Sequence, residues 1–230
     1  MSRTWLHRCL EMFGDTMEER YGKRPDYAAL ERQLEPVKTG ARPFSWRDLE
    51  TIQNPRYGDF RQFWRFPAEG EVSQEVDWDH LSRLIQRLPL DEGDTIARLH
   101  AAFKYVQCVS VVLRFVNPEH YGIVSAPVEK VLEVRRGAAE VETYLHYLGD
   151  IRDARDHYGF ARAADADMAL WVLQEQVLST YRFPELLASY RADAWLRERR
   201  ILNLLAEMSR DEVLELLERA RGMNLGRTGE

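Results

Sequence analysis

The sequence has few cysteines, no long apolar run and no excess of positive charge. Its 230 residues include only two cysteines, Cys9 and Cys108, which is too few for a disulfide framework. The longest apolar stretch, 106–116, contains three polar side chains and is too short to cross a bilayer. The first 20 residues lack the apolar segment of a secretory signal. These absences predict a cytoplasmic protein with no membrane partner.

Sequence motifs for metal, cofactor or nucleophilic chemistry are also missing. There is no glycine-rich phosphate loop, Gly-x-Ser-x-Gly, His-Glu-x-x-His or Cys-x-x-Cys. His146 and Asp150 are four residues apart but have no third ligand near them, so no metal and no cofactor is predicted. The formal charge of −6 means that any contact with DNA phosphates requires a local basic patch.

Helical periodicity dominates the sequence, which predicts an all-α fold with no sheet. Apolar residues at spacings of three and four indicate helices over 3–20, 27–34, 46–53, 94–116, 127–135, 138–148, 149–157, 165–180, 184–190, 192–208 and 210–220, and another that ends near Leu88. Asp165 or Asp167 is predicted to cap the helix that leads into Met168. Residues 54–75 form an irregular, aromatic-rich segment that we expect either to pin a loop to the core or to offer a stacking surface.

The central segment 94–116 contains no glycine or proline and is apolar on most sides. If it forms a single helix, its polar residues make one stripe; they are His100, Lys104, Gln107, Ser110 and Arg114. A polar stripe on a buried helix must face a cleft, a hydrogen-bonding network or solvent. We therefore considered both a cleft-lining stripe and a solvent-facing edge.

Residues 99–132, LHAAFKYVQCVSVVLRFVNPEHYGIVSAPVEKVL, resemble the core of the helix–hairpin–helix DNA glycosylase superfamily, in particular a bacterial branch. The resemblance implies a hairpin at 103–106 and a second helix at 109–116. A loop at 117–122 and an apolar pair, Ile123 and Val124, then precede a further helix. With weaker similarities around 44–49 and 162–171, the match spans roughly residues 44–175.

The resemblance implies two helical lobes around a DNA-binding cleft, a central lobe at 47–105 and a second lobe from 1–46 with 106–222. Residues 1–222 would then form one globular unit, followed by a flexible tail at 223–230. In the family, the hairpin binds a phosphate through backbone amides and a flipped base enters the cleft. An aspartate at the start of the later helix stabilises positive charge on the sugar as the glycosidic bond breaks.

The sequence departs from the family pattern at the sites that matter. The aspartate position is Ser125, which can cap a helix but carries no charge at neutral pH. The hairpin contains no glycine, and the lysine used by some members falls near Gln107 or Cys108, whereas Lys104 lies a turn earlier. Glu129, one turn beyond Ser125, is a candidate source of a carboxylate.

We therefore expect a DNA glycosylase-like, nucleic-acid-related protein with weakened or absent base excision, with duplex DNA carrying a flipped base as its partner. Whether it is an enzyme stays open, because the expected aspartate is Ser125. The candidate catalytic residues are Ser125 and Glu129, and the candidate DNA- or ligand-binding residues are Lys104, Gln107, Ser110, Arg114 and Tyr121. The alternative is a non-catalytic helical module that binds a protein or a small ligand.

Overall fold

The computed structural model describes residues 4–54, 57, 65–67 and 76–225, and within these ranges every regular element is helical. The elements are α1 (Trp5–Glu11), α2 (Phe13–Tyr21), α3 (Tyr27–Lys38), α4 (Trp46–Ile52), α5 (Trp78–Arg87), α6 (Glu92–Phe103), α7 (Val106–Val116), α8 (Ala126–Leu132), α9 (Glu140–Tyr158), α10 (Ala163–Val172), the π-helix η2 (Leu173–Leu178), α11 (Pro184–Ala192), α12 (Ala194–Glu207) and α13 (Arg210–Leu225). The predicted all-α class is confirmed.

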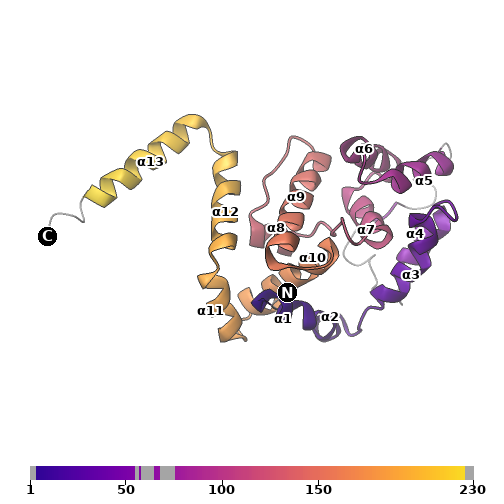
Figure 1. Ribbon diagram of the computed structural model, residues 1–230, viewed down its shortest axis with the longest axis horizontal. Coiled ribbons are helices and arrows are strands. Elements are labelled where there is room, and N and C mark those ends of the chain that lie inside the picture. The colour runs from indigo at the N-terminus through magenta and orange to yellow at the C-terminus, as the bar shows by residue number, and fades with distance from the viewer. Residues whose placement is uncertain (1–3, 55–56, 58–64, 68–75, 226–230) are drawn as a thin grey trace.

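Two groups of helices share the core. The helix α10 packs against α1, α2, α8 and α9, and α7 packs against α3, α6 and α9. Figure 1 shows α3 to α7 on one side of the molecule and α8 to α10, with α1 and α2, in the middle. The helix α9 contacts both α7 and α10 and so links the two groups. The division into the lobes implied by the resemblance stays a prediction.

The chain turns between α6 and α7, so the prediction of one helix over 94–116 is wrong. The helix α6 ends at Phe103, Lys104 adopts a left-handed conformation with φ of 65°, and Tyr105 is extended before α7 begins. The Lys104 amide closes α6 by donating to the carbonyl of His100 at 2.7 Å. A left-handed lysine costs about 1–2 kcal/mol, which the burial of Phe103 and Val106 on either side offsets. This turn lies within 103–106, where the family resemblance implies a hairpin, and the resemblance itself stays a prediction.

Other helix boundaries also differ from the prediction. The first predicted helix is divided at Met12 into α1 and α2. Conversely, the two helices predicted on either side of Gly149 are one, α9, because a glycine inside a helix costs only about 1 kcal/mol. The helix α10 begins at Ala163 after the N-cap Arg162, so Asp165 and Asp167 both lie inside the helix and the prediction that one of them caps it is wrong.

The aromatic segment 54–75 lies mostly outside the described residues. Within it, Tyr57 is buried and its hydroxyl accepts a hydrogen bond from Gln33. Phe66 is partly buried against the core. For these two rings the prediction of aromatic side chains anchored on the core is confirmed.

The last two helices form a C-terminal arm, in which α12 contacts α8 and α13 extends away from the body of the molecule, as Figure 1 shows. Polar contacts join the middle of α12 to α9, where Asp150 accepts hydrogen bonds from Arg199 and Asn203. The helix α13 continues to Leu225, three residues into the predicted flexible tail, and 226–230 lie outside the described residues. Among the helices described, none is long and apolar enough to cross a membrane.

Candidate functional site

A cavity of about 640 Å³ lies where α2, α7, α8, α9 and α10 meet. Its wall includes five residues that can hydrogen-bond or carry charge near the start of α8 or on the helices beside it; they are Gln107, Arg114, Ser125, Glu129 and Asp167. Four of these were predicted site residues, while Asp167 was not. The volume falls in the range of small-ligand sites in proteins, about 300–1,000 Å³.

Asp167 places a buried carboxylate in this wall. The side chain projects from α10 toward the loop before α8, and its Oδ2 accepts the Ile123 amide at 3.0 Å. Its Oδ1 is hydrogen-bonded to the hydroxyl of Tyr147, a fully buried residue of α9. The carboxylate is therefore held at the amide of Ile123, two positions before Ser125 in the chain. It comes from a different helix from the one that the family resemblance implies.

Burial raises the pKa of Asp167 to about 6, although the Tyr147 and Ile123 hydrogen bonds and the charge of Arg114 each lower it. The Tyr147 hydroxyl lies within hydrogen-bond reach of both Asp167 and the carbonyl of Ile123, at 2.6 Å from the latter. A hydroxyl has one hydrogen to donate. When that hydrogen goes to the carbonyl, only a protonated Asp167 can complete the second bond, so the site can hold a proton near neutral pH.

Gly122 is required for the close approach of Asp167 to the loop. A Cβ atom added at Gly122 would lie 3.0 Å from the Asp167 Cγ and 3.1 Å from its Cβ. The neighbouring carbonyl of Gly122 accepts a hydrogen bond from Tyr144 at 3.1 Å, so α9 fixes the loop from the other side. The packing of Gly122 against Asp167 and Tyr144 thus explains why a glycine stands at the second position of the Tyr-Gly pair in the loop.

Ser125 and Glu129 both line the cavity, as candidate catalytic residues should. Ser125 is the N-cap residue of α8, but its hydroxyl makes no capping hydrogen bond. Its Oγ is buried without a hydrogen bond of ordinary geometry, although it lies close enough to the Tyr147 hydroxyl to lower the pKa of that group. The Glu129 carboxylate faces Arg136 at 3.5 Å and is therefore partly neutralised.

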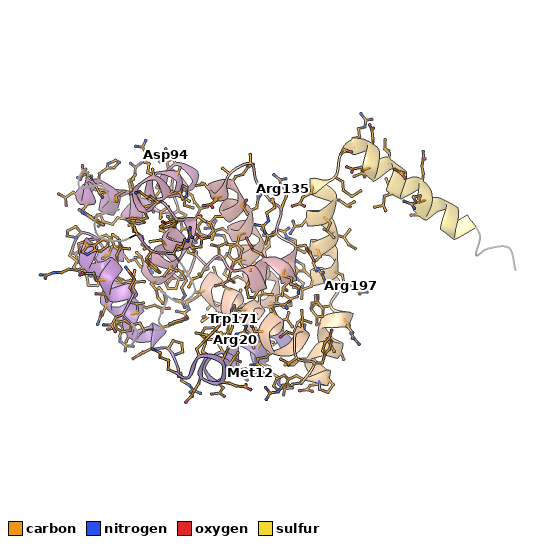
Figure 2. All side chains as sticks on the ribbon, turned by 180° about the vertical axis from the view of Figure 1, so that it is seen from behind. Met12, Arg20, Asp94, Arg135, Trp171 and Arg197 are labelled. Carbon is orange, nitrogen blue, oxygen red and sulfur yellow. The ribbon has the colours of Figure 1, made fainter. Side chains whose placement is uncertain are left out.

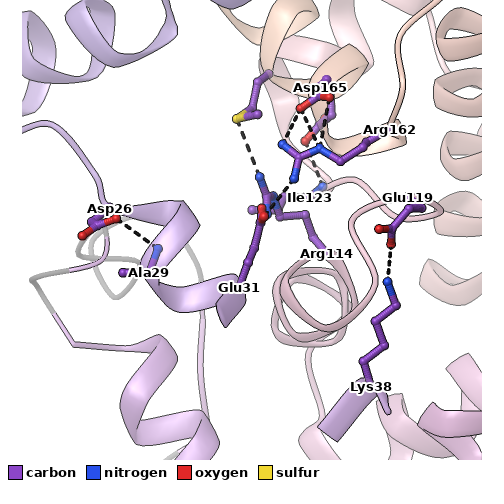
Figure 3. Close-up of polar contacts among 11 residues, drawn as sticks. Asp26, Ala29, Glu31, Lys38, Arg114, Glu119, Ile123, Arg162 and Asp165 are labelled. Carbon is purple, nitrogen blue, oxygen red and sulfur yellow. Dashed lines mark hydrogen bonds and ion pairs between the residues drawn. The ribbon is translucent and has the colours of Figure 1, made fainter. Parts of the chain in front are cut away.

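Arg114 is 1% exposed and lies at the end of a charged network, which Figure 3 shows. Its Nη1 is paired with Glu31, whose other oxygen lies 2.8 Å from Arg162, and Arg162 in turn is paired with Asp165 at 2.6 Å. The Nη2 contacts the sulfur of Met168 at 3.7 Å. Arg114 is thus a buried cation on the cavity wall, and the solvent-facing alternative for the polar stripe does not apply to it.

The remaining predicted binding residues are distributed differently. Gln107, on α7, lines the cavity. Lys104 is exposed at the α6–α7 junction and does not line the cavity. Ser110 is fully buried and supports the loop, since its hydroxyl accepts the Val124 amide at 3.3 Å and donates to the carbonyl of Gln107. Tyr121 is buried under the guanidinium of Arg152, away from the cavity.

Aromatic rings also line the cavity. Trp171 lies 5.6 Å from Phe13 and 6.3 Å from Tyr21 between ring centroids, and Tyr27 lies 5.5 Å from Phe13. These rings come from α2, α3 and α10 and line the cavity together. Figure 2 labels Trp171 of α10 and Arg20 of α2, which both line the cavity. Such a surface suits stacking against a flat ring.

The charges around the cavity are mixed in sign. Two exposed arginines line it, and Arg20 is paired with Glu175 and Arg136 with Glu129. Glu140 adds an exposed carboxylate. The cavity therefore lacks the uniform positive rim that attraction to a phosphate backbone favours.

Asp167 is the residue that sequence reasoning missed. Its signal was an acidic residue in the middle of an alanine-rich helical stretch, AADADMALWV, where a cap is not needed. Elsewhere in the described chain, no cluster of three or more metal-ligating side chains forms a metal site. Comparisons of the chain with protein-family models, curated proteins and solved structures find no match.

Proposed function

We propose that the cavity binds a single nucleobase swung out of DNA, and that the protein is glycosylase-like with weak or absent base excision. The observation that carries the proposal is the presence, in the lining of one cavity, of a buried carboxylate, Asp167, together with Ser125 and a group of aromatic rings. The rings offer a stacking surface for the base. The carboxylate offers a negative charge beside the sugar to which the base is attached.

Weak excision follows from how Asp167 is held. Both oxygens already accept or share a hydrogen bond, and with a pKa of about 6 part of the population is protonated at neutral pH. A protonated carboxyl group cannot stabilise an oxocarbenium-like sugar by charge. Ser125 supplies no charge in its place.

A panel of duplex oligonucleotides, each with one modified base, tests the proposal. One duplex carries 2-aminopurine, whose fluorescence increases when the base leaves the stack. We expect binding at low salt that weakens steeply as salt rises, with an increase in that fluorescence. Excision is measured as strand cleavage in alkali at the abasic site.

Three variants separate the roles of the carboxylates. Asp167→Asn should lower any excision by about 10²–10³-fold, since it replaces a preorganised negative charge by an uncharged amide of similar shape. Ser125→Asp should raise excision. Asp165→Asn is the matched control on the same helix, because its side chain faces Arg162 outside the cavity. Absence of duplex binding at low salt would contradict the proposal.

A second candidate is a protein that binds a free nucleoside or another small planar ligand. The mixed charges around the cavity favour it, because a small ligand needs no basic surface for a phosphate backbone. Titration with free nucleosides distinguishes the two candidates. Nucleoside binding without duplex binding supports the second one.

A further inference from the structure

One of the three guanidinium nitrogens of Arg114, Nε, has no hydrogen-bond partner. Its Nη1 and Nη2 contact Glu31 and Met168, but its Nε is buried and makes no hydrogen bond. The guanidinium is held in place, since its carbon lies 4.4 Å from the centroid of the Phe115 ring and 5.1 Å from that of Tyr27. A buried donor without an acceptor is rare and costly in a folded protein. Because Arg114 lines the cavity, a ligand there can supply the missing acceptor.

Asp167 offers the complementary acceptor on the same wall. Each of its oxygens takes part in one hydrogen bond and has a further lone pair. The two side chains are neighbours: Arg114 contacts the residue that follows Asp167, and its charge acts on the carboxylate. The wall therefore presents a charged donor next to a charged acceptor. The hydroxyl of Ser125, which makes no hydrogen bond of ordinary geometry, adds a further hydrogen-bonding group.

We propose that Arg114 and Asp167 together recognise the edge of a nucleobase at which an N–H lies next to a hydrogen-bond acceptor. Arg114 Nε–H donates to the acceptor, and the Asp167 carboxylate accepts the N–H. The inference rests on the second form of the proposed function, a free nucleoside or a similar planar ligand in the cavity, because one carboxylate cannot contact the sugar and the N–H edge of the same base at once. It makes Arg114 a specificity-determining residue rather than a merely structural one.

A test on the ligand side leaves the protein unchanged. Uridine, 5-methyluridine and 3-methyluridine are titrated against the protein at pH 8, and the quenching of tryptophan fluorescence is followed, since Trp171 lines the cavity. The 3-methyl group removes the N–H, whereas the 5-methyl group adds the same bulk and keeps it. We expect 3-methyluridine to bind about 10- to 100-fold more weakly than the other two, the range for a hydrogen bond to a charged group. Adenosine and N6,N6-dimethyladenosine provide a second pair.

A test on the protein side uses Arg114→Lys, which keeps the positive charge but removes the Nε donor. It should weaken uridine binding at least about tenfold. Glu31→Gln is the matched control: it removes the ion pair of Arg114 but keeps the arginine and its Nε donor. That variant should retain binding within about threefold. Thermal unfolding of each variant establishes that it is folded.

The outcomes separate this inference from the proposed function. If the nucleosides bind and methylation of the N–H changes nothing, the recognition pair is wrong while base binding stands. If Arg114→Lys is folded and binds as tightly as the unaltered protein, Arg114 is structural. If neither the nucleosides nor the duplexes bind, the inference and the proposed function are overturned together.

Discussion

The central helix α7 and the terminal helix α13 both carry apolar side chains, but their surroundings are opposite. In α7, ten of the eleven residues are buried, including the charged Arg114. In α13, Leu214, Leu216 and Leu217 remain 47–54% exposed. An apolar side chain on a helix is therefore buried only where a neighbouring element covers it. The helix α13 has its own local signal, the Ser209–Glu212 capping box, and still leaves these leucines open to solvent.

The largest expected effect is a leucine truncation made in both regions. Leu113→Ala on α7 should lower the free energy of unfolding by about 2–5 kcal/mol, because it leaves a cavity at a fully buried position. The same change at Leu217, which is 54% exposed, should stay within about 0.5 kcal/mol. Urea denaturation monitored by circular dichroism measures both. Equal losses would mean that the arm is packed in solution.

The body and the arm should also differ in how pH affects their stability. Asp167 has a folded-state pKa of about 6 against an ordinary value of 3.8, so the folded protein binds the proton more tightly than the unfolded chain. Its contribution is present below pH 4 and is lost as pH rises through 6, a change of about 3 kcal/mol at 1.36 kcal/mol per pH unit. Asp150 has a pKa shifted in the same direction by burial.

In the arm the sign is reversed. Hydrogen bonds from the hydroxyl and amide of Ser209 lower the pKa of Glu212, so any stabilisation there is lost as pH falls. Unfolding of the unaltered protein and of Asp167→Asn between pH 4 and 8 tests the contrast. Between pH 4 and 6 the unaltered protein should become less stable, and most of that decrease should be absent in the Asp167→Asn variant. An unchanged pH profile would show that Asp167 titrates normally.

Two glycines give a smaller and more local comparison within the body. Gly122→Ala places a methyl group 3.0 Å from the Asp167 Cγ and should cost about 1–3 kcal/mol. Gly149→Ala, inside α9 with no atom within 4 Å of the added Cβ, should stabilise the protein by up to about 1 kcal/mol. Opposite changes in the thermal midpoint are the expected result. A neutral Gly122→Ala would contradict the close packing of the loop on Asp167.

The smallest expected effect is removal of the chain from Ser209 onward, which deletes α13. The main contacts of the arm with the body lie earlier, at Arg199, Arg200 and Asn203 on α12. The thermal midpoint of the truncated protein should therefore remain within about 2 °C of that of the full chain. A larger decrease would place α13 in the cooperative unit.

Much of the fold could be predicted from the sequence because helical periodicity is a local property. The positions of α3, α4 and α7 follow from apolar spacing and from caps such as Ser45. The turn at Lys104 could not be predicted from local composition, since no glycine or proline marks it and packing on both sides imposes it. Only the family resemblance indicated a break there.

The candidate site was predicted in part for a similar reason. Gln107, Arg114, Ser125 and Glu129 lie close in sequence to the hairpin, and all line the cavity. Asp167 lies 42 positions beyond Ser125, and its contacts with Ile123 and Tyr147 arise from tertiary packing alone. A helical wheel places an acidic side chain on a mostly apolar helix, but does not identify which partner faces it.

The π-helix η2 follows α10 directly and contains one more residue in its turn than an α-helix does. In it the Ser179 amide donates to the carbonyl of Gln174, five residues back, so the turn contains one residue more than an α-helical turn. Deleting one residue within 173–178 would restore ordinary α-helical winding at this point. Because the wider turn absorbs the additional residue, Asp167 and Trp171 upstream and α11 downstream should keep their facing. A one-codon deletion here should therefore leave the direction of the arm unchanged, whereas the same deletion in a uniform α-helix would rotate everything downstream by about 100°.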